Sequence, residues 1–162
     1  MKVLLQRVNE ASVTVDHELV GKIGKGLTVF VGVAVGDALE DIEYLVKKIT
    51  ELRIFADAES KFNLSAIDIN AELLLVSQFT LLANTRKGRR PSFAGAAPPE
   101  IAEMLFNQFI ERAKATGLKV EAGRFQQYMR VDIKNDGPVT IFIDSHERLS
   151  SRSSRNINGD SM

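Results

Sequence analysis

The segment from Leu73 to Leu82 (LLLVSQFTLL) is the most apolar stretch of the chain, and it constrains the fold more than any other feature. A run of bulky aliphatic residues of this length predicts a central β-strand that is buried on both faces. Polar side chains nevertheless interrupt the run at Ser77, Gln78 and Thr80. A buried polar group without a partner costs on the order of 1–3 kcal/mol. These residues therefore either face solvent or line a pocket at the end of the strand, and the sequence leaves both interpretations open.

Further strands are expected in both halves of the chain. Residues 27–35 (LTVFVGVAV) are rich in β-branched side chains and predict a second buried strand, with Gly24 and Gly26 marking the turn before it. Shorter strands are expected at residues 1–8, 12–15, 19–23, 54–55, 129–134 and 139–144.

Two segments have the periodicity of amphipathic helices. Asp37 is expected to cap the first helix, which runs through about Arg53. Pro98 and Pro99 are expected to open the second, which runs through about Thr116. The expected buried positions are Ile42, Leu45, Val46, Ile49 and Leu52 in the first helix, and Ile101, Leu105, Phe109 and Ala113 in the second. The pattern predicts an α+β domain, in which mixed or antiparallel sheets curl toward a barrel and are flanked by two main helices.

Composition narrows the class of protein. The 162 residues fit one domain, expected at residues 1–146, and the Ser- and Arg-rich residues 147–162 are expected to form a disordered tail. Lys and Arg number 21, as do Asp and Glu, so the chain lacks the basic excess of a strong, sequence-blind binder of nucleic acid. The absence of cysteine excludes disulfides and thiolate catalysis. No apolar run approaches the length of a membrane span, so a cytoplasmic location is expected.

Familiar catalytic and phosphate-binding motifs do not fit the sequence. The spacing from Gly21 to Gly26 matches the start of a phosphate-binding loop, but Leu27 stands where the lysine is needed and a strand follows instead of a helix. His17 and His146 are the only histidines, and neither lies in a recognisable catalytic context. We expect both to be ordinary surface residues, and we expect no metal site.

A second polar stretch, residues 135–140 (NDGPVT), lies between two expected strands. It is typical of a hairpin turn. A Gly-Pro bond at such a place can also be cis, which would point neighbouring carbonyl groups in similar directions and form an acceptor surface from the main chain. Both interpretations stay open on the sequence.

A basic loop is expected at residues 84–91 (NTRKGRRP). Its cations, Arg86, Lys87, Arg89 and Arg90, could hold phosphates without reading a base sequence, or they could simply be solvated.

The two polar stretches carry a family resemblance. Residues 77–81 (SQFTL) and 135–140 (NDGPVT), together with Gln6-Arg7-Val8 near the start, resemble the signature motifs of D-aminoacyl-tRNA deacylases. The resemblance covers about residues 1–146, and neither motif departs from the pattern.

This resemblance implies a homodimer with a β-barrel-like fold that uses neither a metal nor an organic cofactor. The implied reaction is hydrolysis of the ester that joins a D-amino acid to the 3′ terminal adenosine of tRNA, and the removal of glycine mischarged on tRNA(Ala). It further implies a cis Gly-Pro motif that reaches from one subunit into the active site of the other. The motif would be Gly137 and Pro138, held by Arg7, and the pocket would be lined by Ser77, Gln78, Phe79 and Thr80.

The implied selectivity has a simple stereochemical basis. An L side chain would project into the Gly137-Pro138 carbonyls, whereas a D side chain would point elsewhere, so the wrong hand is rejected by exclusion. Glycine has no side chain to clash, so attack on correctly charged glycyl-tRNA is the expected error.

Two routes could cleave the ester. Backbone N–H groups near Phe79 and Thr80 are candidate oxyanion donors. Thr80 could act as a covalent nucleophile, but no base is evident to activate its hydroxyl. We favour attack by water with help from the ribose 2′-OH, with Thr80 and Gln78 orienting the ester.

Two other classes of function compete with this interpretation. A non-catalytic RNA-binding module that uses the basic loop would bind tRNA but release no amino acid. A small-molecule esterase that uses Ser77 or Thr80 would cleave simple esters without RNA.

Overall fold

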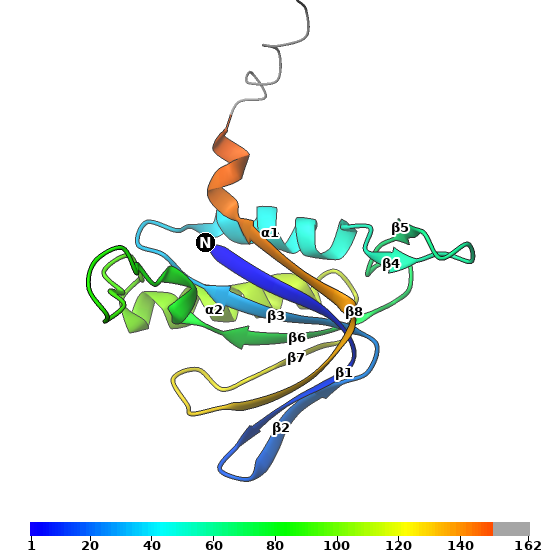
Figure 1. Ribbon diagram of the computed structural model, residues 1–162, viewed down its shortest axis with the longest axis horizontal. Coiled ribbons are helices and arrows are strands. Elements are labelled where there is room, and N and C mark those ends of the chain that lie inside the picture. The colour runs from blue at the N-terminus through cyan, green and yellow to red at the C-terminus, as the bar shows by residue number, and fades with distance from the viewer. Residues whose placement is uncertain (151–162) are drawn as a thin grey trace, which may run out of the picture.

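The fold is a strongly curved mixed β-sheet with two α-helices packed against it, and the computed structural model describes residues 1–150 (Figure 1). The strands are β1 (Lys2–Val15), β2 (Glu18–Ile23), β3 (Gly26–Gly32), β4 (Phe55–Ala56), β5 (Phe62–Leu64), β6 (Glu72–Ser77), β7 (Val120–Ala122) and β8 (Arg130–Asp144). The α-helices are α1 (Leu39–Glu51) and α2 (Pro99–Lys114), and the 3-10 helices are η1 (Phe79–Leu82) and η2 (Ser145–Leu149). The expected α+β class, with two helices beside a barrel-like mixed sheet, is confirmed.

The long strand β1 organises the main sheet. The strand order is β2-β1-β3-β6-β7, and β8 also pairs with β1. β1 is antiparallel to β3 through its first half, to β2 through its second half, and to β8 along nearly its whole length. β3, β6 and β7 are parallel to one another. Because β1 and β8 bend together, the sheet closes most of a barrel (Figure 1). β4 and β5 form a separate two-stranded sheet.

Alternation along the strands creates two hydrophobic cores. Leu73 and Leu75 of β6 face the larger core, which also holds the buried faces of α1 and α2. Leu74 and Val76 face the opposite way, into a smaller core with Val8, Ala11 and Val13 of β1. The central strand is therefore buried on both faces, as the sequence predicts.

The helices lie close to their predicted positions, with two differences. α1 begins after Ala38 instead of Asp37, and the Asp41 carboxylate accepts a hydrogen bond from the Ala38 N–H over 2.9 Å. The Asp37 carboxylate instead accepts a hydrogen bond from the Ala34 N–H, before the helix begins. In α2, Ile101 is 46% exposed, whereas Leu105, Phe109 and Ala113 are buried as expected.

Several predicted boundaries are wrong, and the strand expected through Val35 ends at Gly32. The strand expected through Leu82 ends at Ser77, and η1 follows. The strands expected at 1–8 and 12–15 are one strand, β1. Residues 135–138 are not a hairpin turn, because they lie inside the continuous strand β8.

The end of the described chain also differs from the prediction. Glu147, Arg148 and Leu149 belong to η2 and not to a disordered tail. The remainder of the expected tail, residues 151–162, lies outside the described residues. None of the helices formed by residues 1–150 combines the length and the hydrophobicity that a membrane crossing requires.

Candidate active site

The first part of the candidate site is the turn at the carboxyl end of β6. Ser77 pairs with Val31 of β3, and the Gln78 N–H donates to the Val31 carbonyl over 2.8 Å, which ends the ladder. The chain then tightens into η1, so Phe79 and Thr80 leave the sheet and are exposed. This change of backbone explains how the most apolar segment accommodates polar residues: Ser77 is the last residue of the strand, and Gln78 and Thr80 lie beyond it.

Gly32 allows the turn to pack closely on β3. A Cβ atom at Gly32 would lie 2.5 Å from Leu82 Cδ2 and 3.0 Å from the Gln78 carbonyl oxygen. The first contact is shorter than real side chains show and the second is tighter than most, so a larger residue would require Leu82 and the η1 turn to shift. The position of Phe79 and Thr80 therefore depends on a glycine in the neighbouring strand.

The start of η1 leaves two backbone donors available. Within residues 1–150, neither the Phe79 N–H nor the Thr80 N–H donates to another group of the protein. First-turn N–H groups have no partner inside their own helix. The Gln78 side-chain amide donates to Thr80 Oγ1. The turn thus presents two unused N–H groups beside a hydroxyl that is already fixed by its neighbour.

A cavity of about 800 Å³ opens beside this turn. Ser77, Gln78 and Phe79 form one wall, and residues 125–129 form another. The other lining residues are Val33, Val76, Ala96, Ala97, Pro99, Ala102 and Val131. The lining is mainly apolar, with a few polar groups on both walls, which is typical of a small-molecule pocket.

Of the four residues predicted to line this pocket, three do so. Thr80 is exposed and is not part of the lining, although it is tied to Gln78. Phe79 is 56% exposed, and its ring meets the edge of Phe93 with centroids 4.9 Å apart. The predicted residues are thus gathered at one end of β6, with Thr80 at the rim.

The second polar stretch forms a bulge in β8. Gln6 pairs with Thr140 and Val8 with Asn135, so one residue of β1 faces the four residues 136–139 of β8. The Asn135 side chain spans the bulge: its Oδ1 accepts from the Val139 N–H over 2.8 Å, and its Nδ2 donates to Thr140 Oγ1 over 3.0 Å. Gly137 and Pro138 therefore protrude from the strand, and the hydrogen bonds of the Asn135 side chain fix the residues on either side of them.

The backbone of the bulge requires a glycine. Gly137 has a φ of 136°, a region that L side chains rarely adopt. A Cβ atom there would lie 2.9 Å from Arg7 Nη2 and 3.0 Å from Val139 Cγ2. The peptide bond between Gly137 and Pro138 is cis. Both residues are exposed.

Arg7 lies beneath the bulge and is buried despite its charge. Its Nε donates to the Asp136 carbonyl over 2.9 Å, and its Nη1 donates to the Ile54 carbonyl over 2.6 Å. The Asp136 carboxylate lies 3.5 Å from Arg7 Nε. The guanidinium also stacks over Phe62, 5.1 Å from the ring centroid. These contacts join the bulge to β1 and to the β4–β5 hairpin.

Within one chain the bulge and the cavity lie apart. Arg7 pairs with Leu27 near the start of β3, whereas Ser77 pairs with Val31 near its end. That offset of four residues corresponds to about 13 Å along the sheet, and three strand spacings from β8 to β6 add about 14 Å across it. No residue of the bulge lines the cavity of its own chain. Within one chain, the bulge and the η1 turn therefore do not line one common cavity.

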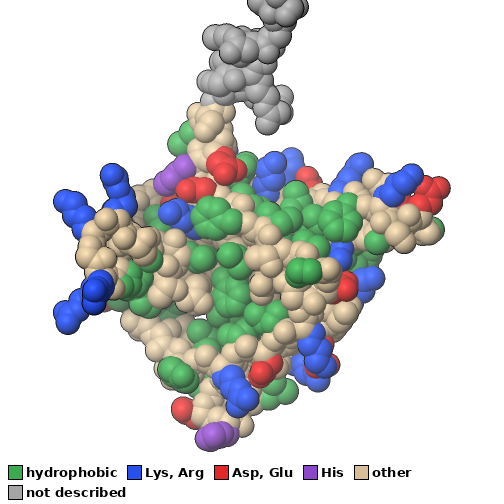
Figure 2. Space-filling view, viewed as in Figure 1, with side chains coloured by type: hydrophobic (Ala, Val, Ile, Leu, Met, Phe, Trp, Pro, Cys, Tyr) green, Lys and Arg blue, Asp and Glu red, His purple; other side chains and the backbone are tan. Residues whose placement is uncertain are grey.

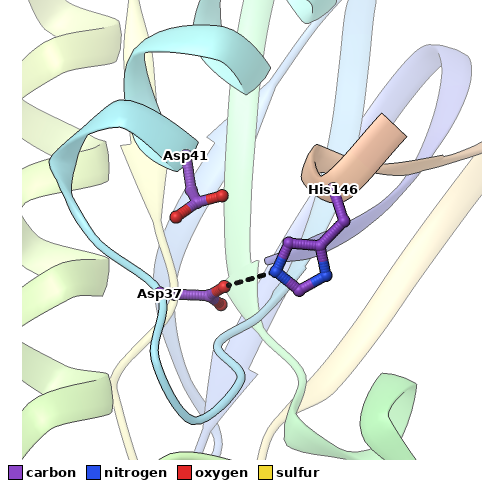
Figure 3. A group of neighbouring side chains, drawn as sticks. All are labelled: Asp37, Asp41 and His146. Atoms are coloured by element: carbon purple, nitrogen blue, oxygen red, sulfur yellow. Dashed lines mark ion pairs between the residues drawn. The ribbon is translucent and has the colours of Figure 1, made fainter. Parts of the chain in front are cut away.

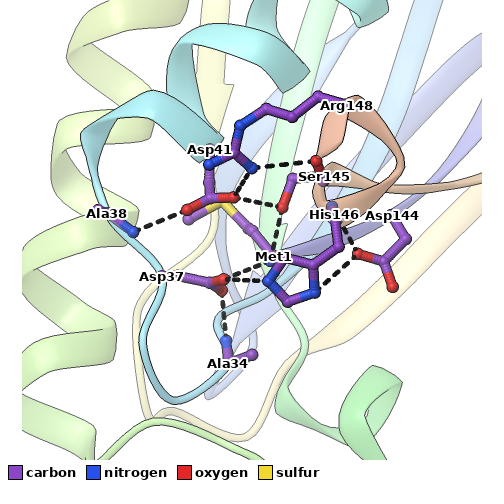
Figure 4. A network of polar contacts seen from close by, with 9 residues as sticks. All are labelled: Met1, Ala34, Asp37, Ala38, Asp41, Asp144, Ser145, His146 and Arg148. Atoms are coloured by element: carbon purple, nitrogen blue, oxygen red, sulfur yellow. Dashed lines mark hydrogen bonds and ion pairs between the residues drawn. The ribbon is translucent and has the colours of Figure 1, made fainter. Parts of the chain in front are cut away.

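A charged cluster lies elsewhere, where η2 meets the start of α1. Asp37, Asp41 and His146 place potential ligand atoms within 4.8 Å of one another (Figure 3). Both carboxylates are already paired with positively charged groups of the protein. Asp37 accepts a hydrogen bond from the Met1 ammonium over 2.5 Å, and Asp41 accepts one from the Arg148 guanidinium (Figure 4). Ser145 bridges the two by donating to Asp41 and accepting from Met1. We assign this cluster to the attachment of Met1 and η2 to the start of α1, and not to a metal.

This network lowers the pKa of the Asp41 carboxyl. Burial raises its pKa, but hydrogen bonds from Ser145 and the Ala38 N–H, with the charges of Met1 and Arg148, outweigh burial and hold the pKa below its ordinary value. Asp41 is therefore ionised at neutral pH and supports η2. The two histidines, His17 and His146, are both exposed, as expected.

Several contributors to the site were not predicted from the sequence. They are Asn135, which spans the bulge, Ile54 and Phe62, which hold Arg7, Phe93, which packs against Phe79, and residues 125–129, which line the cavity. Most of these residues contribute backbone hydrogen bonds or packing contacts, and a single sequence carries no signal for either kind of contact. The run Phe125–Met129 does carry one weak signal, since Tyr128 is a large aromatic residue amid polar ones and is 94% exposed.

Comparison with known proteins places these features in one family. A model of the D-Tyr-tRNA(Tyr) deacylase family matches residues 4–144. A D-aminoacyl-tRNA deacylase of Halothermothrix orenii is 57% identical over 149 residues, which cover 92% of this chain and all of the relative. One from Dehalococcoides mccartyi is 57% identical over 152 residues, which cover 94% of this chain and 99% of the relative.

Solved structures agree with the fold. The c-Myc DNA unwinding element binding protein is 42% identical with a TM-score of 0.84, and the match covers 89% of this chain and 98% of that protein. A probable eukaryotic D-amino acid tRNA deacylase is 17% identical with a TM-score of 0.76, covering 88% and 97%, and it supports the fold alone. The chain belongs to the D-Tyr-tRNA(Tyr) deacylase family.

Proposed function

We propose that this chain hydrolyses the ester between a D-amino acid and the 3′ terminal adenosine of tRNA. Water adds to the ester carbonyl carbon, the bond to the ribose oxygen breaks, and the products are a free D-amino acid and tRNA with its 3′ hydroxyl restored. Relatives over 50% identical are named D-aminoacyl-tRNA deacylases, which are hydrolases acting on ester bonds, and this supports the reaction class.

One observation carries the proposal: two unused N–H groups begin the η1 turn, and the first residue of that turn, Phe79, lines the cavity. An ester carbonyl that enters from the cavity toward η1 would meet the N–H groups of Phe79 and Thr80. As water adds, negative charge grows on the carbonyl oxygen, and donors that are already oriented stabilise that charge without reorganisation. Removing one such donor typically costs about 10²–10³ in kcat.

Water is the nucleophile that the surroundings of Thr80 favour. Within residues 1–150, the group that hydrogen-bonds Thr80 Oγ1 is the Gln78 amide, which donates the hydrogen bond and cannot act as a base for the hydroxyl. An alcohol without a base is a weak nucleophile. The tRNA itself offers the 2′-OH beside the ester, which can orient water and accept or relay a proton. Gln78 and Thr80 then serve to orient the substrate.

The active site is completed by a second subunit. Gly137 and Pro138 are exposed and do not line the cavity of their own chain. Hydrophobic side chains gather over the strands on the face shown in Figure 2, and Phe142 of β8 is 50% exposed. Such a patch suits an interface between two copies. A two-fold interface would deliver each bulge to the cavity of the other subunit, which gives two sites per homodimer.

The bulge then supplies the chiral filter. An L-aminoacyl ester with its carbonyl toward η1 would direct its side chain at the main-chain carbonyls of the partner's bulge. A D side chain would point away from them, and many D side chains could be accepted. Glycine has no side chain to exclude, so glycine mischarged on tRNA(Ala) would also be cleaved.

The direct test offers D-tyrosyl-tRNA and L-tyrosyl-tRNA to the purified protein and measures release of tyrosine. Rapid loss of the D form alone is expected. Binding of tRNA without release of either amino acid would favour an RNA-binding module. Equal cleavage of both forms, or cleavage of simple tyrosine esters at a similar rate, would favour a general esterase.

A further inference from the structure

The loop between η1 and α2 holds the densest group of positive charges in the described chain. Arg86, Lys87, Arg89 and Arg90 lie within five consecutive positions, and all are exposed. No Asp or Glu lies between Glu72 and Glu100. Lys and Arg side chains project from this end of the molecule in Figure 2, around the loop drawn in green in Figure 1.

These four cations have no partner in the part of the chain that the structure describes. Within residues 1–150, none of their side chains forms an ion pair or donates a hydrogen bond. The chain as a whole has a formal net charge of +0, so the loop is a local concentration of charge on a neutral protein. Unpaired surface cations at high density are the groups that neutralise phosphates in nucleic-acid complexes.

The loop has a defined base. Asn84 and Ser92 pair in both directions, with the Asn84 N–H donating over 2.8 Å and the Ser92 N–H donating over 2.9 Å. The Arg86 N–H donates to Asn84 Oδ1 over 3.0 Å. Gly88 has a φ of 69° and turns the chain between the two cationic pairs. The four cations therefore sit on a closed loop and not on a loose segment.

The base of the loop is joined to the candidate active site. Phe93, next to Ser92, packs against Phe79 at the cavity wall, and Ala96 and Ala97 beyond it line the cavity. Arg90 is three residues from Phe93, a span of at most about 11 Å. The cations thus stand beside the entrance that a 3′ terminal adenosine would use.

We infer that this loop binds the phosphates of the tRNA acceptor end, upstream of the terminal adenosine, and so positions the aminoacyl ester in the cavity. The inference rests on the proposed function for its substrate. When the last nucleotide occupies the cavity, the RNA strand that precedes it must pass over the rim of the cavity. Each nucleotide of that strand carries one negative charge on its phosphate. Contacts from Arg and Lys to phosphates carry no base information, which suits an enzyme that must accept different tRNAs.

A matched pair of double variants tests the inference. Arg89→Gln/Arg90→Gln removes two charges from the loop, and Lys47→Gln/Lys48→Gln removes two exposed charges from α1. Both leave the same net charge. Three substrates or ligands are compared: D-tyrosyl-tRNA, uncharged tRNA, and D-tyrosyl-adenosine, which has the same ester but no phosphate.

The loop variant is expected to raise KM for D-tyrosyl-tRNA about tenfold and to weaken uncharged tRNA binding similarly. The slope of log affinity against log salt should become shallower by about 1 to 2, because about one counterion is released for each phosphate contact. The α1 variant should stay within about twofold of wild type. Both variants should cleave D-tyrosyl-adenosine at the wild-type rate.

Two results would overturn the inference. Unchanged KM, tRNA affinity and salt slope in the loop variant would show that the cations do not meet the substrate. An equal loss on D-tyrosyl-adenosine would show that the loop acts through the shape of the cavity. Binding of uncharged tRNA reports on the loop even if the wild-type protein cleaves no D-tyrosyl-tRNA, so the two proposals can fail separately.

Discussion

The guanidinium of Arg7 donates to the backbone carbonyl of Asp136 over 2.9 Å, from beneath the bulge that carries Gly137 and Pro138. A buried charge is tolerated where its donors are satisfied, and Arg7 also reaches the Ile54 carbonyl over 2.6 Å. The same side chain thus fixes two main-chain segments, one of which is the proposed filter. Its role follows from its fork of donors, which one ammonium group cannot reproduce.

Arg7→Lys should therefore lower both stability and activity. A lysine can reach one of the two carbonyls but not both, and leaving a buried acceptor unsatisfied costs about 1–3 kcal/mol. We expect a loss of about 2 kcal/mol in the free energy of unfolding, measured by urea denaturation, together with a fall in kcat/KM for D-tyrosyl-tRNA. The matched control is Arg130→Lys, on the exposed surface of β8, which should behave as wild type.

Phe79→Pro tests the oxyanion donors directly. Phe79 is the first residue of η1, where a proline fits the backbone but removes the N–H. Loss of one donor should reduce kcat by about 10²–10³ with little change in fold. Phe79→Leu also removes the ring but keeps the N–H, so it should retain far more activity. Equal losses in the two variants would mean that the ring, and not the N–H group, matters.

Thr80→Ala separates the two routes to hydrolysis. If the hydroxyl only orients the substrate, its loss removes about one hydrogen bond and should lower kcat about tenfold at most. Single-turnover hydrolysis of D-tyrosyl-tRNA measures this. A variant with no detectable turnover and a correct fold would instead identify Thr80 as the nucleophile.

Asp41→Asn tests the network that attaches η2. The pKa of Asp41 is lowered in the folded state, so its carboxylate stabilises the fold above its ordinary pKa of 3.8, and this stabilisation is lost as the pH falls through the lowered value. The variant should be about 3 kcal/mol less stable at pH 7, because Arg148 and Met1 lose a buried partner.

The pH dependence of the unfolding free energy tests whether the pKa of Asp41 is lowered in the folded state. The difference in unfolding free energy between wild type and Asp41→Asn should be constant at neutral pH and shrink below about pH 4. Glu103→Gln, at an exposed position on α2, should show no such change. A difference that grows as the pH falls would contradict the assignment.

The sequence predicts the central strands and both helices because their signals are local. β-branched and aliphatic runs fix β3 and β6, and the spacing of Leu45 and Ile49 fixes the buried face of α1. The end of β6 could not be predicted in the same way. The strand stops at Ser77 because Gly32, in a different strand, leaves room for η1 to fold back.

The bulge in β8 shows the same limit. Residues 135–138 have the composition of a hairpin turn, yet β1 offers partners to the segments on both sides of them, so the strand continues and the extra residues protrude. A turn and a bulge share residue preferences, and long-range pairing decides between them. Likewise, Arg7 can be marked as a site residue from the motif, but its partners Ile54 and Phe62 cannot.

If each active site combines the η1 turn of one subunit with the bulge of the other, two inactive variants should complement each other when their subunits are mixed. Gly137→Val disrupts the bulge through its φ of 136° and the 2.9 Å contact with Arg7 Nη2, and Phe79→Pro disrupts the oxyanion donors. Each homodimer should be nearly inactive on D-tyrosyl-tRNA. Unfolding the two together and refolding them should restore about 25% of wild-type activity, since half of the dimers are mixed and each holds one intact site. If the mixture stays as inactive as its components while wild type recovers fully under the same treatment, each site lies within one subunit.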